Sequence, residues 1–136
     1  MALKLAAPIE KEFTLDETDQ HYCTEGTRVT IRQAAQAQHE RRSNLFATLT
    51  REYLDENEDG VVRLVQRFNL PELMRMEAYL TLVESNIEDE NGSPLFRPGM
   101  SESQFAKSWG KLPQIAAYEI HKKVLEVNPD WKPAGE

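Results

Sequence analysis

Apolar and polar residues alternate in two short segments near the beginning of the chain. Phe13 and Leu15 fall on one face of residues 10–15, and residues 27–32 repeat the same pattern. A period of two is typical of a β-strand with one buried face, so the segments predict a pair of strands. The polar connection between them is long for a hairpin loop, and we expect it to be mobile or to make a contact.

The composition then changes to residues that favour helices. Residues 33–42 are rich in Ala, Gln, Glu and Arg, which predicts a short helix. Residues 45–53 fit both a helical stripe and one face of a strand. We favour a strand, because residues 62–68 form a second alternating row beyond the polar DENEDG sequence, and the two rows would complete a hairpin.

The clearest helix begins at Asn69, whose side chain can cap it, with Pro71 in the first turn. Its apolar residues recur at helical spacing and form one stripe: Leu73, Met76, Leu80, Val83 and Ile87. The stripe predicts a continuous helix with one buried face. We expect the polar turn at residues 89–92 to end it.

Two further helices are predicted towards the end of the chain. Ser101 and Gln104 can form a capping box at the start of a short helix that Gly110 closes. Pro113 begins the next helix, and Pro129 stops it.

Together these elements predict an α+β fold: a small mixed domain with N-terminal antiparallel strands or hairpins, a central helix and a C-terminal helical pair. We expect one domain over residues 1–136, with a frayed lead-in at residues 1–8 and a flexible tail at residues 132–136.

The net charge of −7 argues against a general affinity for nucleic acid. One basic patch is expected around Arg41 and Arg42, with Arg32 and Arg51 nearby, but glutamates interrupt it, and we interpret it as a solvated face. No apolar run approaches the length that spans a bilayer, so no membrane partner is expected. The lone Cys23 and the lack of an export signal favour a reducing cytoplasm.

A partial calcium-loop motif lies in the predicted hairpin turn. Asp55, Asn57 and Asp59 occupy its first, third and fifth positions, but Gln66 replaces the bidentate glutamate of the twelfth. We therefore interpret the segment as an acidic turn and predict no metal site. His21 and Cys23 lack further ligands at metal-site spacing, and we predict no catalytic residue, no cofactor and no enzyme activity.

Large aromatic residues are concentrated near the C-terminus. Phe105 and Trp109 have the spacing of a buried helix face, whereas Trp131 follows the helix stop and is the better candidate for an exposed anchor, or for a lid that folds back. The predicted partner-binding residues are Trp131, Phe96, Trp109 and Tyr118.

Several short sequences in this chain have counterparts in one family. They are "TRVTIRQA", "NIEDENGSPLFRPG", the spacing SxxxFxxxWxxLP from Ser101 to Pro113, and the closing "EVNPDW". On these residues the chain resembles the tail assembly chaperones of long-tailed bacteriophages. The resemblance covers most of the chain and is densest after Leu70.

The resemblance implies a non-enzymatic protein of the infected bacterial cytoplasm that is not part of the mature virion. Its expected partners are the tape measure protein and the tail tube protein, and a homo-oligomer is compatible with this role. Two alternatives remain. One is a structural virion component, such as a head-to-tail joining protein, that associates through a sheet edge or its hairpins. The other is a small regulatory module that binds nucleic acid through the arginine patch.

Overall fold

A computed structural model describes residues 2–5, 7–51, 54–56, 62–64 and 70–132. It has the mixed α+β fold that the sequence predicts, with a three-stranded antiparallel sheet and five α-helices. In chain order the elements are β1 (Glu10–Thr14), α1 (Asp16–Tyr22), β2 (Arg28–Arg32), α2 (Gln36–Arg51), β3 (Leu54–Glu56), β4 (Val62–Leu64), α3 (Leu70–Thr81), β5 (Leu82–Ser85), α4 (Glu102–Gly110), α5 (Gln114–Val127) and the 3₁₀ turn η1 (Pro129–Trp131).

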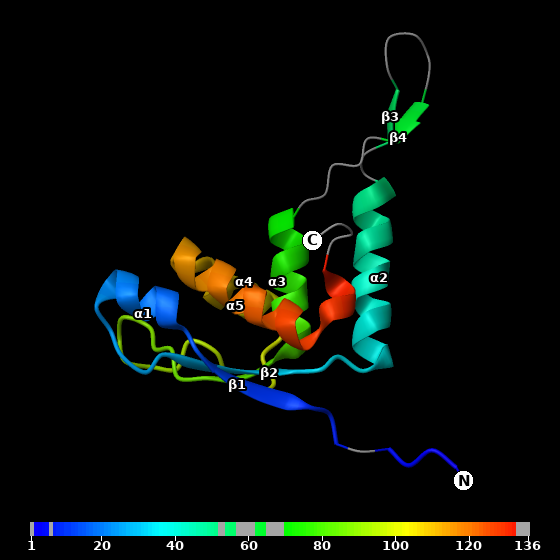
Figure 1. Cartoon of the computed structure of the whole chain (residues 1–136). Helices are drawn as coiled ribbons and strands as arrows, with labels where there is room; N and C mark the ends of the chain where they lie inside the picture. Colours follow the sequence, from blue (N-terminus) through cyan, green and yellow to red (C-terminus); the bar gives the residue numbers. More distant parts are fainter. Residues whose placement is uncertain (1, 6, 52–53, 57–61, 65–69, 133–136) are drawn as a thin grey trace.

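The sheet has the order β1–β2–β5, and helices cover one of its faces (Figure 1). The predicted pairing of the first two strands is confirmed, with Phe13 opposite Val29 and Lys11 opposite Ile31. Val29 and Ile31 are fully buried and pack in one core with Ile120 of α5. Apolar and polar residues alternate along β2, so Val29 and Ile31 lie on the same face, and this face of the sheet packs against the helices.

The connection between β1 and β2 contains the helix α1, which was not predicted. Its first turn is capped by a residue far away in the sequence: the carboxylate of Glu119 on α5 accepts hydrogen bonds from the backbone N–H groups of Glu17 (3.0 Å) and Thr18 (2.9 Å). The first N–H groups of a helix have no acceptor within the helix. The buried Glu119 carboxylate accepts hydrogen bonds from two of them, and its negative charge interacts favourably with the positive end of the helix dipole. The expectation that this segment makes a contact is thus correct.

The prediction of a strand at residues 45–53 is wrong over its described part, because α2 extends without a break to Arg51. The helical alternative is correct for this part, and Leu45 packs against the core from α2. The second predicted strand is confirmed at Val62–Leu64, where β4 pairs with β3. Figure 1 places this hairpin beyond the end of α2, away from the sheet.

The predicted continuous helix to Ile87 is also wrong, because α3 ends at Thr81 and the chain continues as strand β5. Asn69 lies outside the described residues. Two side chains close the end of α3: Thr81 donates to the Glu77 carbonyl at 2.7 Å, and Arg32 donates to the Leu80 carbonyl. Val83 and Ile87 therefore belong to the strand region that pairs with β2 and to the loop that follows.

The C-terminal helical pair is confirmed in detail. Ser101 and Gln104 form the predicted capping box of α4, and Pro113 is the N-cap residue of α5. Pro129 follows the end of α5, as expected, and begins the turn η1. The predicted turn at residues 89–92 is present as well, with Gly92 at a φ of 78° and its N–H bonded to the Asp89 carbonyl.

Candidate protein-binding site

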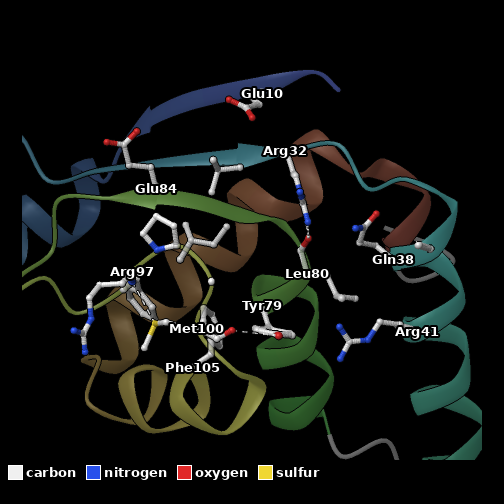
Figure 2. Close-up of a pocket in the computed structure, with 16 residues that line it drawn as sticks. Glu10, Arg32, Gln38, Arg41, Tyr79, Leu80, Glu84, Arg97, Met100 and Phe105 are labelled. Atoms are coloured by element: carbon white, nitrogen blue, oxygen red, sulfur yellow. Dashed lines mark hydrogen bonds between the residues drawn. The ribbon is translucent and has the colours of Figure 1, made fainter. Parts of the chain in front are cut away.

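An open cavity of about 520 Å³ lies between the sheet, α2, α3 and the loop that precedes α4 (Figure 2). Each of these elements contributes lining residues, and α4 adds Phe105. A cavity of this size accommodates a few side chains of a partner or a small ligand.

Arg32 lines the cavity and also binds the end of α3. Its Nε and Nη2 atoms donate to the Leu80 carbonyl at 3.2 and 3.1 Å. Carbonyl groups in the last turn of a helix lack partners within the helix, and a cation there complements the helix dipole. Arg32 is therefore held in place by the fold.

The other two arginines of the cavity are less constrained. Arg41 pairs with Glu102 at 3.2 Å, both side chains being half exposed, and its guanidinium lies 5.4 Å from the ring centre of Tyr79. The Arg97 side chain is exposed, makes no side-chain hydrogen bond among the described residues and interacts electrostatically with the Asp89 carboxylate, and its backbone N–H is bonded to the Met100 sulfur. Figure 2 shows Arg97 and Arg41 on opposite sides of the cavity, with Tyr79 and Met100 between them.

Aromatic rings form one wall of the cavity. The Phe105 ring centre lies 5.3 Å from that of Tyr79 and 5.1 Å from that of Phe96. The Tyr79 hydroxyl donates to the Met100 carbonyl at 3.4 Å. These contacts hold the loop of residues 96–100 against α3 and α4, so the wall is preformed. Two carboxylates, Glu10 and Glu84, lie on the side of the sheet.

The four predicted partner-binding residues do not come together. Trp131 is only 4% exposed, so the expectation of an exposed anchor is wrong; the alternative, that it folds back on the domain, is correct. Phe96 lines the cavity but is itself buried. Trp109 is half-buried and stacks on Phe105, with ring centres 5.9 Å apart. Tyr118 is half exposed on α5 and does not line the cavity.

Trp131 is held by a polar network that joins α2, α3, α5 and η1. Its indole Nε1 donates to His39, and the Arg42 guanidinium lies 5.3 Å from its ring centre. Arg42 in turn pairs with the buried Glu77 at 2.9 Å, and His121 contacts the other oxygen of that carboxylate at 2.9 Å. Both histidines therefore have structural partners.

The predicted arginine patch is divided between different contacts. Arg32 and Arg41 both line the cavity, Arg32 also binds the Leu80 carbonyl, and Arg42 is directed to Glu77; the Arg51 side chain is outside the described residues. The nucleic-acid alternative stays a prediction.

No group of three or more His, Cys, Asp or Glu side chains suited to a metal ion occurs among the described residues. Asn57 and Asp59 of the calcium-like motif lie outside them, as does the side chain of Asp55, so the interpretation as an acidic turn stays a prediction. Cys23 is exposed and at a φ of 54°, in the turn that ends α1.

Among the described residues, the carboxylates of Asp19 and Asp89 have a lowered pKa, and neither lines the cavity. Hydrogen bonds from the hydroxyls of Thr27 and then Thr24 lower the pKa of Asp19. Backbone N–H groups of Ser93 and then Asn91 lower the pKa of Asp89. Each carboxylate organises a turn, and we assign both to the stability of the fold.

Arg97 was not among the predicted site residues, whereas Arg32 and Arg41 were predicted only as members of a solvated basic patch. The signal for Arg97 is its place in the sequence FRPGM, beside Phe96 and before a Gly99 that adopts a φ of 77°. Such a turn presents the intervening side chain at the surface next to an aromatic wall. Arg32 has no comparable local signal, because its partner Leu80 is 48 residues away.

A second exposed feature lies at the N-terminus. Leu3 and Leu5 are 89% and 88% exposed, and Ile9 is also exposed. They precede β1, which pairs with β2 and has no neighbour on its other side among the described strands. The residue pairing leaves the backbone groups of Glu10, Glu12 and Thr14 facing that free edge.

Comparisons of the chain with protein families, with curated proteins and with solved structures find no match. In the part of the chain that the structure describes, no helix combines the length and apolar character needed to cross a bilayer.

Proposed function

We propose that this protein is a tail assembly chaperone of a long-tailed bacteriophage, which binds the tape measure protein and helps to recruit tail tube subunits. One observation carries the proposal: the residues that resemble this family also build the cavity wall. The sequence NIEDENGSPLFRPG ends in the loop that contributes Phe96 and Arg97, and the SxxxFxxxWxxLP spacing contributes Phe105.

The physical character of the site suits reversible protein binding. The wall is apolar and preformed, so little conformational entropy is lost when a partner binds. The rim carries an exposed ion pair, Arg41–Glu102, and such pairs contribute about 0–1 kcal/mol, so a partner's charge can replace Glu102 at small cost. An assembly chaperone must bind and then release its partner, and a modest, partly polar site fits that requirement.

In this proposal the protein acts in the cytoplasm of the infected bacterium, without a cofactor or a catalytic step, and leaves the tail before the virion is complete. Its exposed N-terminal leucines and free β1 edge offer a second surface for another component of the assembly.

The test is co-expression of the full chain with a helical fragment of the tape measure protein encoded in the same genome, followed by size-exclusion chromatography. We expect the fragment to become soluble and to elute with the protein. A fragment that stays insoluble or elutes alone would overturn the proposal. A tape measure fragment from an unrelated phage is the matched control.

The free edge of β1 favours one alternative, a structural virion component that associates through that edge. Mass spectrometry of purified particles separates the two functions. A chaperone is absent from the particles, whereas a head-to-tail joining or tail protein is present in a fixed ratio to the tube subunits.

A further inference from the structure

Among the described residues, the most exposed large apolar side chains lie directly before an unpaired sheet edge. Leu3 and Leu5 are 89% and 88% exposed, and Ile9 is 63% exposed. They precede β1, which has no neighbour on its outer side among the described strands (Figure 1). A sheet edge with unpaired backbone groups can add a further strand, and a protein that works as a monomer usually protects such an edge.

Residues 2–5 and 7–9 form an arm that precedes β1. Its apolar residues Leu3, Leu5 and Ile9 alternate with small or polar ones, in phase with Phe13 of β1. Phe13 packs against the core from the face of the sheet that the helices cover. Successive side chains of a strand point to opposite faces, so an arm that continues β1 presents its apolar residues on the helix-covered face. Lys4 then lies on the other face.

We infer that the arm and β1 pair antiparallel with the same segment of a second copy of this chain, about a two-fold axis at Ala7. Each arm adds a strand to the free β1 edge of the other copy, and the two three-stranded sheets join into one sheet. Such an interface is closed, because each copy both offers and receives an arm. The inference does not depend on the proposed function, and another component of the assembly can use this edge only by displacing the second copy.

The backbone of β1 is oriented for this pairing. The Ile9 carbonyl accepts a hydrogen bond from the Gln33 N–H at 2.8 Å, on the β2 side. Neighbouring residues of an antiparallel strand face opposite ways, so residues 10, 12 and 14 turn their N–H and C=O groups to the free edge. With the axis at Ala7, Glu10 lies opposite Lys4 of the second copy, and the two residues exchange backbone hydrogen bonds.

Charge argues against registers centred within β1. An axis at Glu10, Lys11 or Glu12 places each of these residues directly opposite its own copy, and like charges in that position destabilise a strand pair. An axis at Ala7 places Lys4 opposite Glu10 instead. By symmetry the interface contains this pair of opposite charges twice.

The same register pairs the exposed apolar side chains. Leu5 lies opposite Ile9 of the second copy in a non-hydrogen-bonded pair, where the two strands bring side chains closest together. Leu3 lies opposite Lys11, whose aliphatic stem offers apolar surface. The side chains of the arm that are exposed in one copy are therefore covered in the pair.

The neighbouring register has its axis at Pro8 and places Lys4 opposite Glu12. Glu12 already lies 3.6 Å from Arg28, whereas the Glu10 side chain makes no hydrogen bond or ion pair within the described part of the chain. Pro8 lacks an N–H group in either register and does not distinguish them. The axis at Ala7 is preferred because it gives the Glu10 carboxylate a partner.

Cysteine cross-linking of the full chain tests the axis directly. The two copies of residue 7 form a non-hydrogen-bonded pair, with Cα atoms about 4.5 Å apart, which a disulfide can span. Ala7→Cys, in a Cys23→Ser background that removes the native thiol, should therefore give a covalent dimer with oxidised glutathione. Ile9→Cys in the same background is the matched control, because its two copies are separated by about 13 Å along the ladder and should not cross-link.

Sedimentation velocity measures the association itself. We expect the unchanged chain to dimerise with a micromolar Kd. Leu5→Ser should raise the Kd by about thirtyfold or more, because one substitution removes two covered leucines from each dimer. Tyr118→Ser is the matched control, since it removes a half-exposed aromatic ring of α5 and should leave the Kd unchanged. Circular dichroism establishes that each variant is folded.

A charge exchange tests the register. Lys4→Glu and Glu10→Lys should each raise the Kd by about fivefold, because each places like charges opposite one another. The double variant restores a pair of opposite charges and should return the Kd to within about twofold of the unchanged chain. Lys107→Glu, at an exposed lysine of α4, is the control for the change in net charge and should have no effect.

Three results would overturn the inference: an unchanged chain that stays monomeric at about 200 μM, cross-linking of Ala7→Cys no faster than that of Ile9→Cys, or a Leu5→Ser variant that dimerises as tightly as the unchanged chain. A double charge variant that does not recover would contradict the axis at Ala7.

Discussion

Trp131 and His39 are hydrogen-bonded across 92 residues of the chain, the indole Nε1 donating to the imidazole Nδ1 at 3.0 Å. The rings meet edge-on, with centres 5.5 Å apart. The bond satisfies the one polar group of a side chain that is otherwise buried in the core, and it ties the turn η1 to α2.

Substitution of Trp131 tests this arrangement. Trp131→Ala should lower the free energy of unfolding by about 3–5 kcal/mol, because a large buried ring is lost. Trp131→Phe should cost about 1–2 kcal/mol, because the ring is mostly retained while His39 loses its donor. Urea unfolding followed by circular dichroism measures both.

Trp109→Phe is the comparison, since Trp109 is only half-buried, and its cost should be smaller than that of Trp131→Phe. If Trp131→Ala and the unchanged protein had the same free energy of unfolding, the packing of Trp131 against α2 would be contradicted.

The burial of Trp131 illustrates what local pattern cannot predict. Pro129 correctly marks the end of α5, but the direction of the chain after it depends on the surface that receives the ring. That surface is provided by α2, which extends to Arg51 and places His39 and Arg42 beside the indole. His39 and Arg42 lie in residues 33–42, which were correctly predicted as helical, but local pattern does not show which distant residue packs against that helix.

Strand β5 was missed for a related reason. The helical stripe from Leu73 continues in the sequence through Val83, so periodicity alone extends the helix. The helix ends because Arg32 binds the Leu80 carbonyl and β2 offers an edge for pairing. A helix cap formed by neighbouring residues, the Ser101 capping box of α4, was predicted correctly. A helix end that depends on a residue distant in the sequence, as the end of α3 depends on Arg32, was not predicted.

The same distinction applies to the candidate site. Phe96 was expected to contact a partner and does line the cavity, although it is buried. Arg32 and Arg41, on the consecutive elements β2 and α2, are joined at the cavity by Arg97 from the distant loop before α4. These arginines can be recognised as lining one cavity only when the strand order and the position of α2 relative to the sheet are known.

Glu77 is 2% exposed and pairs with both Arg42 and His121. Glu77→Gln should lower the free energy of unfolding by about 3 kcal/mol, because it leaves the Arg42 charge partly buried without its counter-ion. A double-mutant cycle with Arg42→Met, measured by urea unfolding, should show a favourable coupling. Additive costs would contradict the network. Arg75→Gln, at an exposed pair, should change stability by less than about 0.5 kcal/mol.

Glu119 caps α1 from a distance and is 3% exposed. Glu119→Gln should cost about 1–3 kcal/mol, because the amide has one acceptor oxygen where the carboxylate has two and carries no charge for the helix dipole. Amide hydrogen exchange should speed up at Glu17 and Thr18 specifically.

The control for this substitution is Glu126→Gln on the same helix, where the side chain is half exposed and pairs with Lys123 at 3.5 Å. It should change stability by less than about 0.5 kcal/mol. If exchange at Thr18 is unaffected by the loss of the Glu119 carboxylate, the distant cap does not operate in solution.

Asp19 predicts a pH dependence of stability. Its carboxylate accepts hydrogen bonds from Thr27 and Thr24, which hold its pKa below the ordinary value of 3.8. Because the pKa is lower in the folded chain, the stabilisation is fully present above about pH 4 and is lost as the pH falls through the folded pKa. The stability difference between the unchanged chain and Asp19→Asn should therefore be large at pH 6 and shrink below pH 4. Carboxyl NMR titration should give a midpoint for Asp19 below 3.8, and Thr27→Val should raise it. A midpoint at or above 3.8 in the unchanged chain would show that these hydroxyls do not bind the ionised carboxylate.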